Sequence, residues 1–306
     1  MNTLPAIGIH PGVPFVDYQR WDAVNISKLK HFARSPLHAR FAMDNPKEET
    51  DALRLGHALH VSTFEPARWA QEFTVIPEFK CNTKDGKQGL IGCIGDLIGR
   101  ELSEGESKLT KDEIMAIGRR EARKCILDAG EFEAIEGMGA AIRGSRAARV
   151  HLDAPGECEA SCMWKDETTG LLCKGRFDKL ITAAISAGPQ FDRIIVELKS
   201  TRNAKRGPFG RDAANFCYHA QAAHYTSGHK AATGHPALHV IIAVESEPPH
   251  GVAVYALPNA AIQSGELLRC KWLEQYADCL ASGEWPGYPD EVQELELPGW
   301  AMEGAW

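Results

Sequence analysis

Apolar and polar residues alternate along several segments in the second half of the chain, with the period of two that is typical of half-buried β-strands. These segments are residues 158–164, 171–180, 193–200, 238–244 and 252–257. Turn-forming residues separate them, at Gly170, at Gly188-Pro189 and at the run Pro248-Pro249-His250-Gly251. The pattern therefore predicts a compact run of strands followed by a further strand pair.

The first half of the chain carries helix-starting signals instead. Ser27 and Ser35-Pro36 have the capping hydroxyl of a helix start, followed in the second case by proline at the first helical position. Thr110-Lys-Asp-Glu113 is a capping box, which predicts a helix through Ile126. Short helices are expected at the first two signals, over residues 27–33 and 36–43. Further helices are expected over residues 53–64, 130–150, 215–230 and 260–282.

This order of elements predicts an α/β fold, with a central mixed β-sheet flanked by helices and a helical N-terminal part. Residues 79–105, rich in Gly, Lys and Asp, are expected to be a loop or an insertion. Because no Pro/Gly/Ser-rich linker divides the chain, we expect one domain. The expected division is a tail over residues 1–17, the domain over 18–300 with its catalytic core at about 151–260, and a tail over 301–306.

Composition narrows the class of protein only slightly. A hydrophobic content of 44% and a charged content of 25% are ordinary for a globular protein. The net charge of -7 argues against coating nucleic acid by bulk charge, but it permits a local basic groove around an acidic site. The absence of a long apolar run or a secretory leader, with nine cysteines in no repeated spacing, favours a cytoplasmic protein without membrane partners.

Charged residues interrupt two of the predicted strands. Alternation places Lys174, Arg176 and Asp178 on one face of the first strand, and Glu197 and Lys199 on one face of the next. Buried charges are costly unless they are paired or bind a metal ion, and a salt bridge within the sheet is the simplest alternative. Two carboxylates beside one ammonium also suit a Mg²⁺ ion, with the lysine orienting or deprotonating a water that attacks phosphorus.

Asp178 followed by Glu197-Leu-Lys199 resembles the signature of PD-(D/E)xK nucleases, whose core is restriction-endonuclease-like. Gly56-His-Ala-Leu-His60 is similar to a helix of the RecB-type branch, and Gln221-Ala-Ala-His-Tyr225 matches its downstream Q-x-x-x-Y motif. The chain also resembles the nuclease domains of exodeoxyribonuclease VIII and related phage exonucleases over residues 18–300. The segments that carry this second resemblance are Ser27-Lys-Leu, Ser35-Pro36, Cys173–Asp178, Val196–Thr201 and Trp285–Tyr288.

The resemblance implies a role for each matching residue. The metal ligands would be His60, Asp178, Glu197 and the backbone carbonyl of Leu198, with Glu159 as a further candidate. The catalytic set would be Asp178, Glu197, Lys199, Gln221 and Tyr225. A hydrogen-bonded core histidine is the alternative for His60, and it is our expectation for His57. Core packing is our expectation for Tyr218.

The resemblance also implies the reaction and its setting. It predicts a Mg²⁺-dependent deoxyribonuclease, with Mn²⁺ able to substitute, that acts 5′→3′ on the ends of linear duplex DNA. Relatives work in phage or prophage recombination beside a single-strand annealing protein, and they form homo-oligomeric rings. A structure-specific or single-strand nuclease on the same core, or a catalytically silent DNA-binding protein, are the alternatives.

Basic residues near the predicted site are candidates for DNA contacts. The candidates are Arg176, then Arg202, Lys205, Arg206 and Arg211 in the segment after the catalytic strand, and Lys84 and Lys87 further upstream. Solvated surface charge is the alternative for these residues, and Phe209 is expected either to stack on a base or to anchor its loop. The segment Asn82–Lys87 has asparagine where relatives carry an arginine, and the spacing of Cys270 and Cys279 does not match an iron–sulfur cluster motif, so no cluster is expected.

Overall fold

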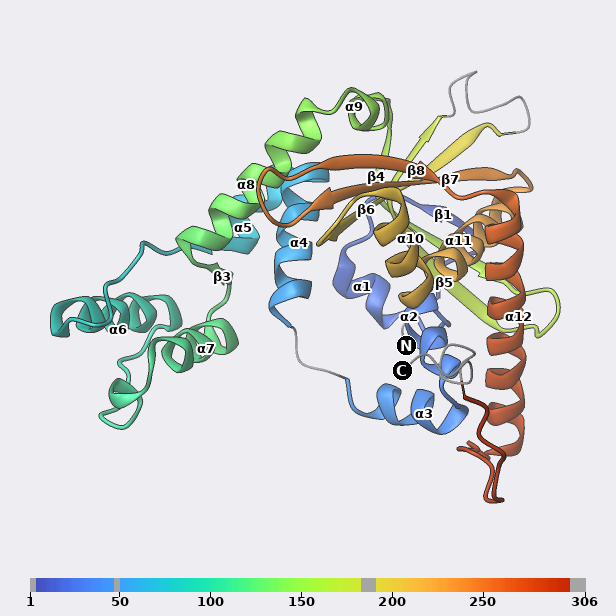
Figure 1. Cartoon of the computed structure of the whole chain (residues 1–306), viewed down its shortest axis with the longest axis horizontal. Helices are drawn as coiled ribbons and strands as arrows, with labels where there is room; N and C mark the ends of the chain where they lie inside the picture. The colour runs from blue at the N-terminus through green and yellow to red at the C-terminus, as the bar shows by residue number, and fades with distance from the viewer. Residues whose placement is uncertain (1–3, 47–49, 183–190, 298–306) are drawn as a thin grey trace, which may run out of the picture.

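A six-stranded mixed β-sheet forms the centre of the molecule (Figure 1), in a computed structural model that describes residues 4–46, 50–182 and 191–297. In spatial order its strands are β1 (Gly8–His10), β4 (Gly156–Lys165), β5 (Leu172–Thr182), β6 (Arg193–Thr201), β7 (Ala237–Glu245) and β8 (Val252–Ala256). Neighbours are antiparallel, except that β6 and β7 are parallel. The predicted α/β fold with a central mixed sheet is confirmed.

Helices cover both faces of this sheet. On one face the apolar side chains of β5 and β6 pack against α11 (Tyr218–Thr233), α12 (Asn259–Ser282) and the N-terminal helices. The N-terminal helices are α1 (Phe15–Arg20), α2 (Ile26–Leu29), the 3₁₀ helix η1 (Lys30–Ala33) and α3 (Pro36–Asp44). The other face packs against α4 (Asp51–Phe64), α8 (Ala129–Gly144) and α9 (Arg146–Leu152). Within the described ranges, no helix is long and apolar enough to cross a membrane.

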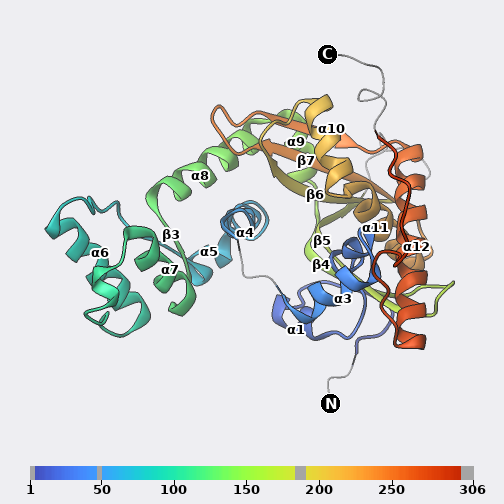
Figure 2. The same ribbon diagram turned by 60° about the horizontal axis from the view of Figure 1, so that its bottom comes forward.

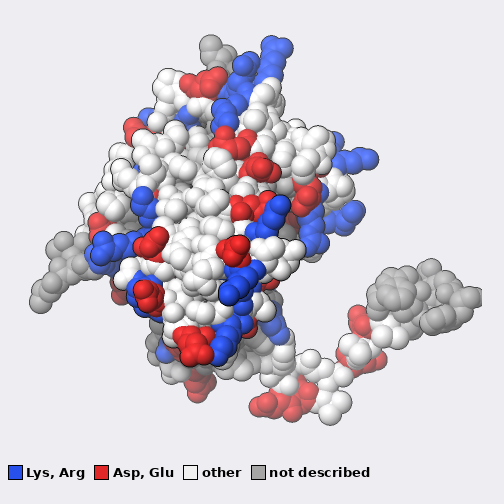
Figure 3. Space-filling model, turned by 90° about the vertical axis from the view of Figure 1, so that its left-hand side faces the viewer, with Lys and Arg blue, Asp and Glu red and all other residues white. Residues whose placement is uncertain are grey.

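An arm projects from the end of the central sheet near α4 and α8. In both ribbon views it lies away from the six strands of that sheet (Figures 1 and 2). It contains η2 (Pro66–Arg68), α5 (Trp69–Glu72), β2 (Phe73–Val75), α6 (Lys84–Ile98), η3 (Glu106–Lys108), α7 (Lys111–Glu121) and β3 (Cys125–Leu127). The arm has a small core of its own, in which Leu90, Ile94 and Ile114 are fully buried. Seen from the side of the arm, basic and acidic side chains are interspersed rather than gathered into a field of one sign (Figure 3).

The structure corrects several predicted boundaries. The expectation of a loop over residues 79–105 is wrong, because α6 begins at the Thr83 cap and buries Leu90 and Ile94 against α7. The Thr110 capping box is confirmed, but its helix ends at Glu121 rather than Ile126.

Other boundaries differ because of features that are weak in the sequence pattern. The helix expected over residues 130–150 is interrupted at Ser145, which leaves the helical conformation and caps α9. Residues 8–10 of the expected N-terminal tail form β1 at the edge of the sheet. The basic segment after β6 is a loop only in part, because α10 (Arg206–Asn215) begins within it. The predicted turn at Gly188-Pro189 lies outside the described residues.

Candidate active site

A cavity of about 810 Å³ opens between the N-terminal helices, α4 and the strands β4 to β6. Many of the residues that the sequence singled out line it, which means that segments far apart in the chain meet here. The predicted residues on its wall are His60, Glu159, Arg176, Asp178, Leu198, Lys199 and Tyr225. Glu197 and Gln221 lie directly behind them, joined to the wall by hydrogen bonds.

Asp178 lies at the point where β5 and β6 separate. The Leu198 backbone N–H donates to Asp178 Oδ2 at 2.7 Å, and this bond fixes the carboxylate next to the Glu197–Lys199 segment. Burial, followed by repulsion from Glu197, raises the pKa of Asp178 well above its usual value. Among the described residues no lysine or arginine makes an ion pair with Asp178, although the charge of Lys199 opposes the rise in its pKa.

His60 reaches the same point from α4. Its Nε2 lies 3.1 Å from the Leu198 carbonyl oxygen, which can only accept, so Nε2 carries the proton. Burial, together with the charge of Lys199, lowers the pKa of His60 to about 4, so the ring is neutral at neutral pH. Its Nδ1 therefore presents a lone pair to Asp178 Oδ2 at 3.4 Å, which is unfavourable for the ionised carboxylate unless a proton or a metal cation lies between them.

Glu159 completes this group from β4. Its backbone has φ of 52°, a left-handed conformation that costs free energy in a residue other than glycine. The Arg176 Nε donates to Glu159 Oε2 at 2.7 Å and holds the carboxylate toward the cavity. Burial raises the pKa of Glu159, although Arg176 opposes this effect.

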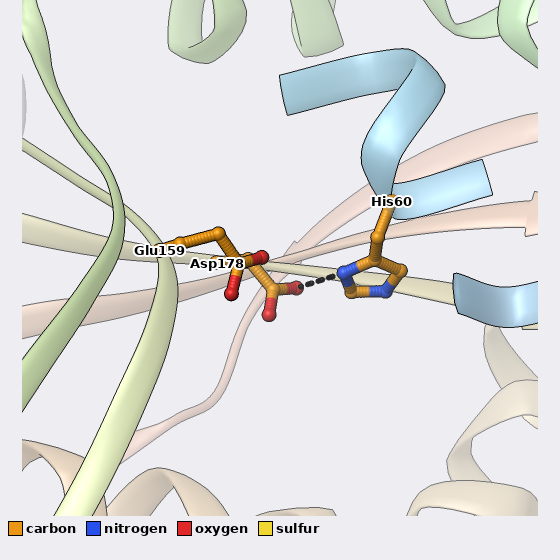
Figure 4. A group of neighbouring side chains, drawn as sticks. All are labelled: His60, Glu159 and Asp178. Carbon is orange, nitrogen blue, oxygen red and sulfur yellow. Dashed lines mark ion pairs between the residues drawn. The ribbon is translucent and has the colours of Figure 1, made fainter. Parts of the chain in front are cut away.

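One ligand atom each from His60, Glu159 and Asp178 lies within 4.8 Å of the other two, and the side chains converge from α4, β4 and β5 (Figure 4). Two hard carboxylates and a neutral imidazole are donors for a divalent cation. A cation here would offset the charge of Asp178 and separate it from the lone pair of His60. The residues present therefore fit a divalent metal ion. Sequence reasoning placed Glu159 last among the candidates because its left-handed conformation leaves no mark on the sequence.

Glu197 and Lys199 form the second half of the site. Lys199 Nζ and Gln221 Nε2 both donate to Glu197 Oε1, each at 2.6 Å, while Glu197 Oε2 is buried and has no hydrogen-bond partner among the residues that the structure describes. Although burial alone would raise it, the pKa of Glu197 is lowered by Lys199 and His239. The pKa of Lys199 is raised, because the charges of Glu197 and Asp178 outweigh its burial. Lys199 is therefore an ammonium and Glu197 a carboxylate at neutral pH.

Gln221 and Tyr225 support this pair from α11. Gln221 Nε2 lies between Glu197 Oε1 and the Tyr225 hydroxyl, which is 3.3 Å away. The four-residue spacing places both side chains on one face of the helix. In this arrangement Gln221 fixes the orientation of Glu197, and Tyr225 lines the cavity below it.

Two residues near the site were not predicted to be there. Lys30 Nζ lies 3.5 Å from Gln221 Oε1, and burial together with Lys199 lowers the pKa of Lys30 to about 8. Tyr218, expected in the core, lines the cavity, with Lys199 Nζ 5.1 Å and Lys30 Nζ 5.6 Å from its ring centroid. The segment Ser27-Lys-Leu was a signal for the helix that carries Lys30, but its pairing with α11 depends on the fold.

The basic residues predicted to bind DNA fall into three groups. Arg176 is partly buried, and besides Glu159 it donates to the Val13 carbonyl and the Ser161 hydroxyl. Lys84 and Lys87 lie on α6 in the arm, which the ribbon views place away from the strands of the site (Figures 1 and 2). The exposed group consists of Arg202, Lys205, Arg206 and Arg211, just after β6.

The chain is similar to known proteins in sequence and in fold. Residues 25–298 match the model of a family described as a PDDEXK-like domain of unknown function (DUF3799). Among solved structures, the chain is similar to a protein from Eubacterium rectale described as a "putative exonuclease". The identity is 14% and the TM-score 0.52, over 93% of this chain and 94% of that chain.

An alkaline exonuclease from Laribacter hongkongensis is also similar, with 14% identity and a TM-score of 0.26, over 66% of this chain and 97% of that chain. No curated protein matches the sequence significantly. The likeness to the Eubacterium rectale protein shows a shared fold. The family match confirms the resemblance drawn from Asp178, Glu197 and Lys199, and because it spans residues 25–298, this chain belongs to the family of PDDEXK-like domains.

Proposed function

We propose that this chain is a metal-dependent deoxyribonuclease that hydrolyses DNA phosphodiester bonds, with Mg²⁺ as its ion and Mn²⁺ able to substitute. The observation that carries the proposal is the buried carboxylate of Asp178, which has no ion pair with a lysine or arginine among the described residues and lies within 4.8 Å of ligand atoms of His60 and Glu159. The Glu197–Lys199 pair lies beside that group on the next strand. The family match to a PDDEXK-like domain supports the same reading.

Each residue has a role that follows from its protonation state. His60, Asp178 and Glu159 would hold the ion, with Glu197 Oε2 and the second lone pair of the Leu198 carbonyl as further ligands. When bound, a divalent ion polarises the phosphate and makes a bound water more acidic. Lys199 keeps its proton at neutral pH, so its ammonium orients the water and stabilises negative charge on the phosphate rather than acting as a base.

We further propose that the substrate is the end of linear duplex DNA and that cleavage runs 5′→3′, in the cytoplasm. The setting would be phage or prophage recombination, with a single-strand annealing protein as partner and a homo-oligomeric ring as the working assembly. Resemblance to exodeoxyribonuclease VIII and phage exonucleases supports this part. The site itself is equally compatible with a structure-specific or single-strand nuclease.

A cleavage assay on linear duplex DNA tests the reaction. Cleavage should require added Mg²⁺ or Mn²⁺ and stop with EDTA. Replacing Lys199 by Ala should slow it by at least about a thousandfold, equal to about 4 kcal/mol, while DNA binding persists. Lys271→Ala, at an exposed position of α12, is the matched control and should cleave normally. Full cleavage by Lys199→Ala would refute the mechanism.

Polarity needs a separate assay. Duplexes labelled at the 5′ or the 3′ end, with and without a 5′ phosphate, should release the 5′ label first. Early release from the 3′ end alone would overturn the proposed direction and leave the metal site untouched. Cleavage of single strands or branched duplexes in preference to blunt ends would favour the alternative nucleases. Binding with no cleavage of any of them would favour the silent DNA-binding protein.

A further inference from the structure

Phe216 is an exposed aromatic residue at the junction of α10 and α11. Its exposed fraction is 58%, although its ring stacks on that of Tyr218, with centroids 5.8 Å apart and planes inclined by 28°. Tyr218 lines the catalytic cavity, and its ring centroid is 5.1 Å from Lys199 Nζ. A single ring therefore separates the exposed Phe216 from the catalytic ammonium.

Phe216 is the outer end of a row of aromatic rings that reaches back to the sheet. Behind Tyr218 lies Phe209, whose ring centroid is 6.2 Å from that of Tyr218 and which is only 4% exposed. Phe209 in turn stacks on Tyr255 of β8 at 5.4 Å, and the Tyr255 hydroxyl donates to the Ala204 carbonyl at 2.6 Å. The buried Phe209 thus anchors the segment after β6, and the row supports Phe216 from behind.

The backbone beside Phe216 is also unusual. Cys217 has φ of 54°, a left-handed conformation that L-residues adopt rarely and at a cost. It separates α10 from α11, so Phe216 directly follows the last residue of the first helix and Tyr218 begins the second. Strain of this kind is retained where the surrounding structure fixes it, and here it accompanies an apolar ring left in solvent.

The segment of the chain that precedes this exposed ring carries four cations. Arg202, Lys205, Arg206 and Arg211 are exposed, and in the described part of the chain none of them makes an ion pair. Most other arginines of this acidic protein lie beside a carboxylate, as Arg40 does beside Asp44 and Arg100 beside Glu106. Cations without ion pairs on a segment that leads to an exposed aromatic ring are a combination that suits single-stranded nucleic acid, through phosphate contacts and base stacking.

We infer that Phe216 is a base-stacking residue for single-stranded DNA that passes along α10 to or from the catalytic cavity. This role rests on the proposed nuclease function, and it assigns the route by which one DNA strand runs along α10 to or from the catalytic cavity. The ligand is single-stranded, because within a duplex both faces of a base are already covered by its neighbours. The cations of the α10 segment hold the backbone of this strand, and Phe216 supports one base close to the phosphate bound at Lys199.

Binding in EDTA tests the inference without any cleavage. The probe is a single-stranded oligonucleotide with 2-aminopurine at successive positions, whose fluorescence is quenched when the base stacks. Wild-type protein should quench one position. Phe216→Ala should lose that quenching and bind about tenfold more weakly, equal to about 1.4 kcal/mol. Phe216→Trp should restore both, and Phe216→Leu, which keeps an apolar side chain, should restore neither.

Phe41→Ala is the matched control, since Phe41 is 68% exposed on α3 and does not line the cavity. It should bind as the wild type does. Affinity of Phe216→Ala within twofold of wild type, or an equal loss for a blunt duplex, would overturn the inference. Because no metal ion is present, these outcomes are independent of cleavage. A wild-type protein that binds through Phe216 but never cleaves would refute the proposed function alone.

Discussion

Two clusters of charged side chains lie along helix α4, and they are built in opposite ways. Near the start of α4, Arg54 is 3% exposed and pairs with Asp51 and Glu131, each at 2.6 Å. Arg119 donates to the same Glu131 at 2.9 Å. Two acids and two arginines thus offset one another, and the pKa of Arg54 is raised because these hydrogen bonds outweigh its burial.

The cluster at His60, further along α4, has no such balance. Glu159 pairs with Arg176 and Glu197 pairs with Lys199, but Asp178 has no cation of its own in the described structure. The raised pKa of Asp178 records the cost. The difference teaches how to separate structural from functional charge. A structural cluster is neutral in itself, whereas a functional one leaves a charge for its ligand to offset.

The largest expected effect is the loss of protein stability when the Arg54 cluster is broken. Arg54→Ala leaves Glu131 short of a partner and should lower the free energy of unfolding by about 3–5 kcal/mol. Urea denaturation followed by circular dichroism measures it. The control is Arg40→Ala, which removes an exposed i,i+4 pair with Asp44 and should cost at most about 1 kcal/mol. A change no larger than that of the control would show that the Arg54 cluster is not structural.

The next largest effect is the stabilisation of the folded chain by a metal ion bound at the cluster at His60. Adding Mg²⁺ or Mn²⁺ at about 100 times its dissociation constant should raise the free energy of unfolding by about 2.7 kcal/mol, because only the folded chain gathers the ligands. EDTA should reverse the gain, and Asp178→Asn should abolish it. Arg54→Ala should keep it, since that cluster binds no ion. Equal stabilisation of the wild type and Asp178→Asn would place the ion elsewhere.

The smallest expected effect is the decrease in the free energy of unfolding that the buried Asp178 carboxylate causes in the metal-free protein. Because its pKa is raised by folding, the folded chain holds this proton at pH values where the unfolded chain has lost it. The destabilisation is therefore absent below about pH 4 and appears as the pH rises above that value. In EDTA at pH 7, Asp178→Asn should be more stable than the wild type by about 1–2 kcal/mol, with the difference disappearing toward pH 4.

Matched pH series of urea denaturation would measure this difference. The exposed Asp278→Asn on α12 is the control and should show no such trend. A variant that gains stability while losing cleavage would mark Asp178 as a residue kept for function rather than for the fold. Lower stability of Asp178→Asn at every pH would instead make Asp178 a structural residue.

The sequence predicted most of the sheet and much of the site, for physical reasons that are local. Alternation along β5 and β6 requires only a buried face, so Asp178, Glu197 and Lys199 were recognisable as charges within buried strands. The Thr110 capping box is likewise a contact within four residues. The α6 helix was missed because its glycine-rich sequence is weakly helical and its stability comes from burial against α7.

Tertiary structure decided what those charges do. Only the fold brings His60 and Glu159 within reach of Asp178 and gives Glu159 its left-handed backbone. Only the fold leaves Asp178 without an ion pair to a lysine or arginine in the described part of the chain. Only the fold places Lys30 beside Gln221 and exposes Phe216 at the end of an aromatic row. The sequence by itself determined which residue types are present on each strand and helix. Their distances, their burial and therefore their pKa values arise between segments far apart in the chain, where sequence periodicity carries no information.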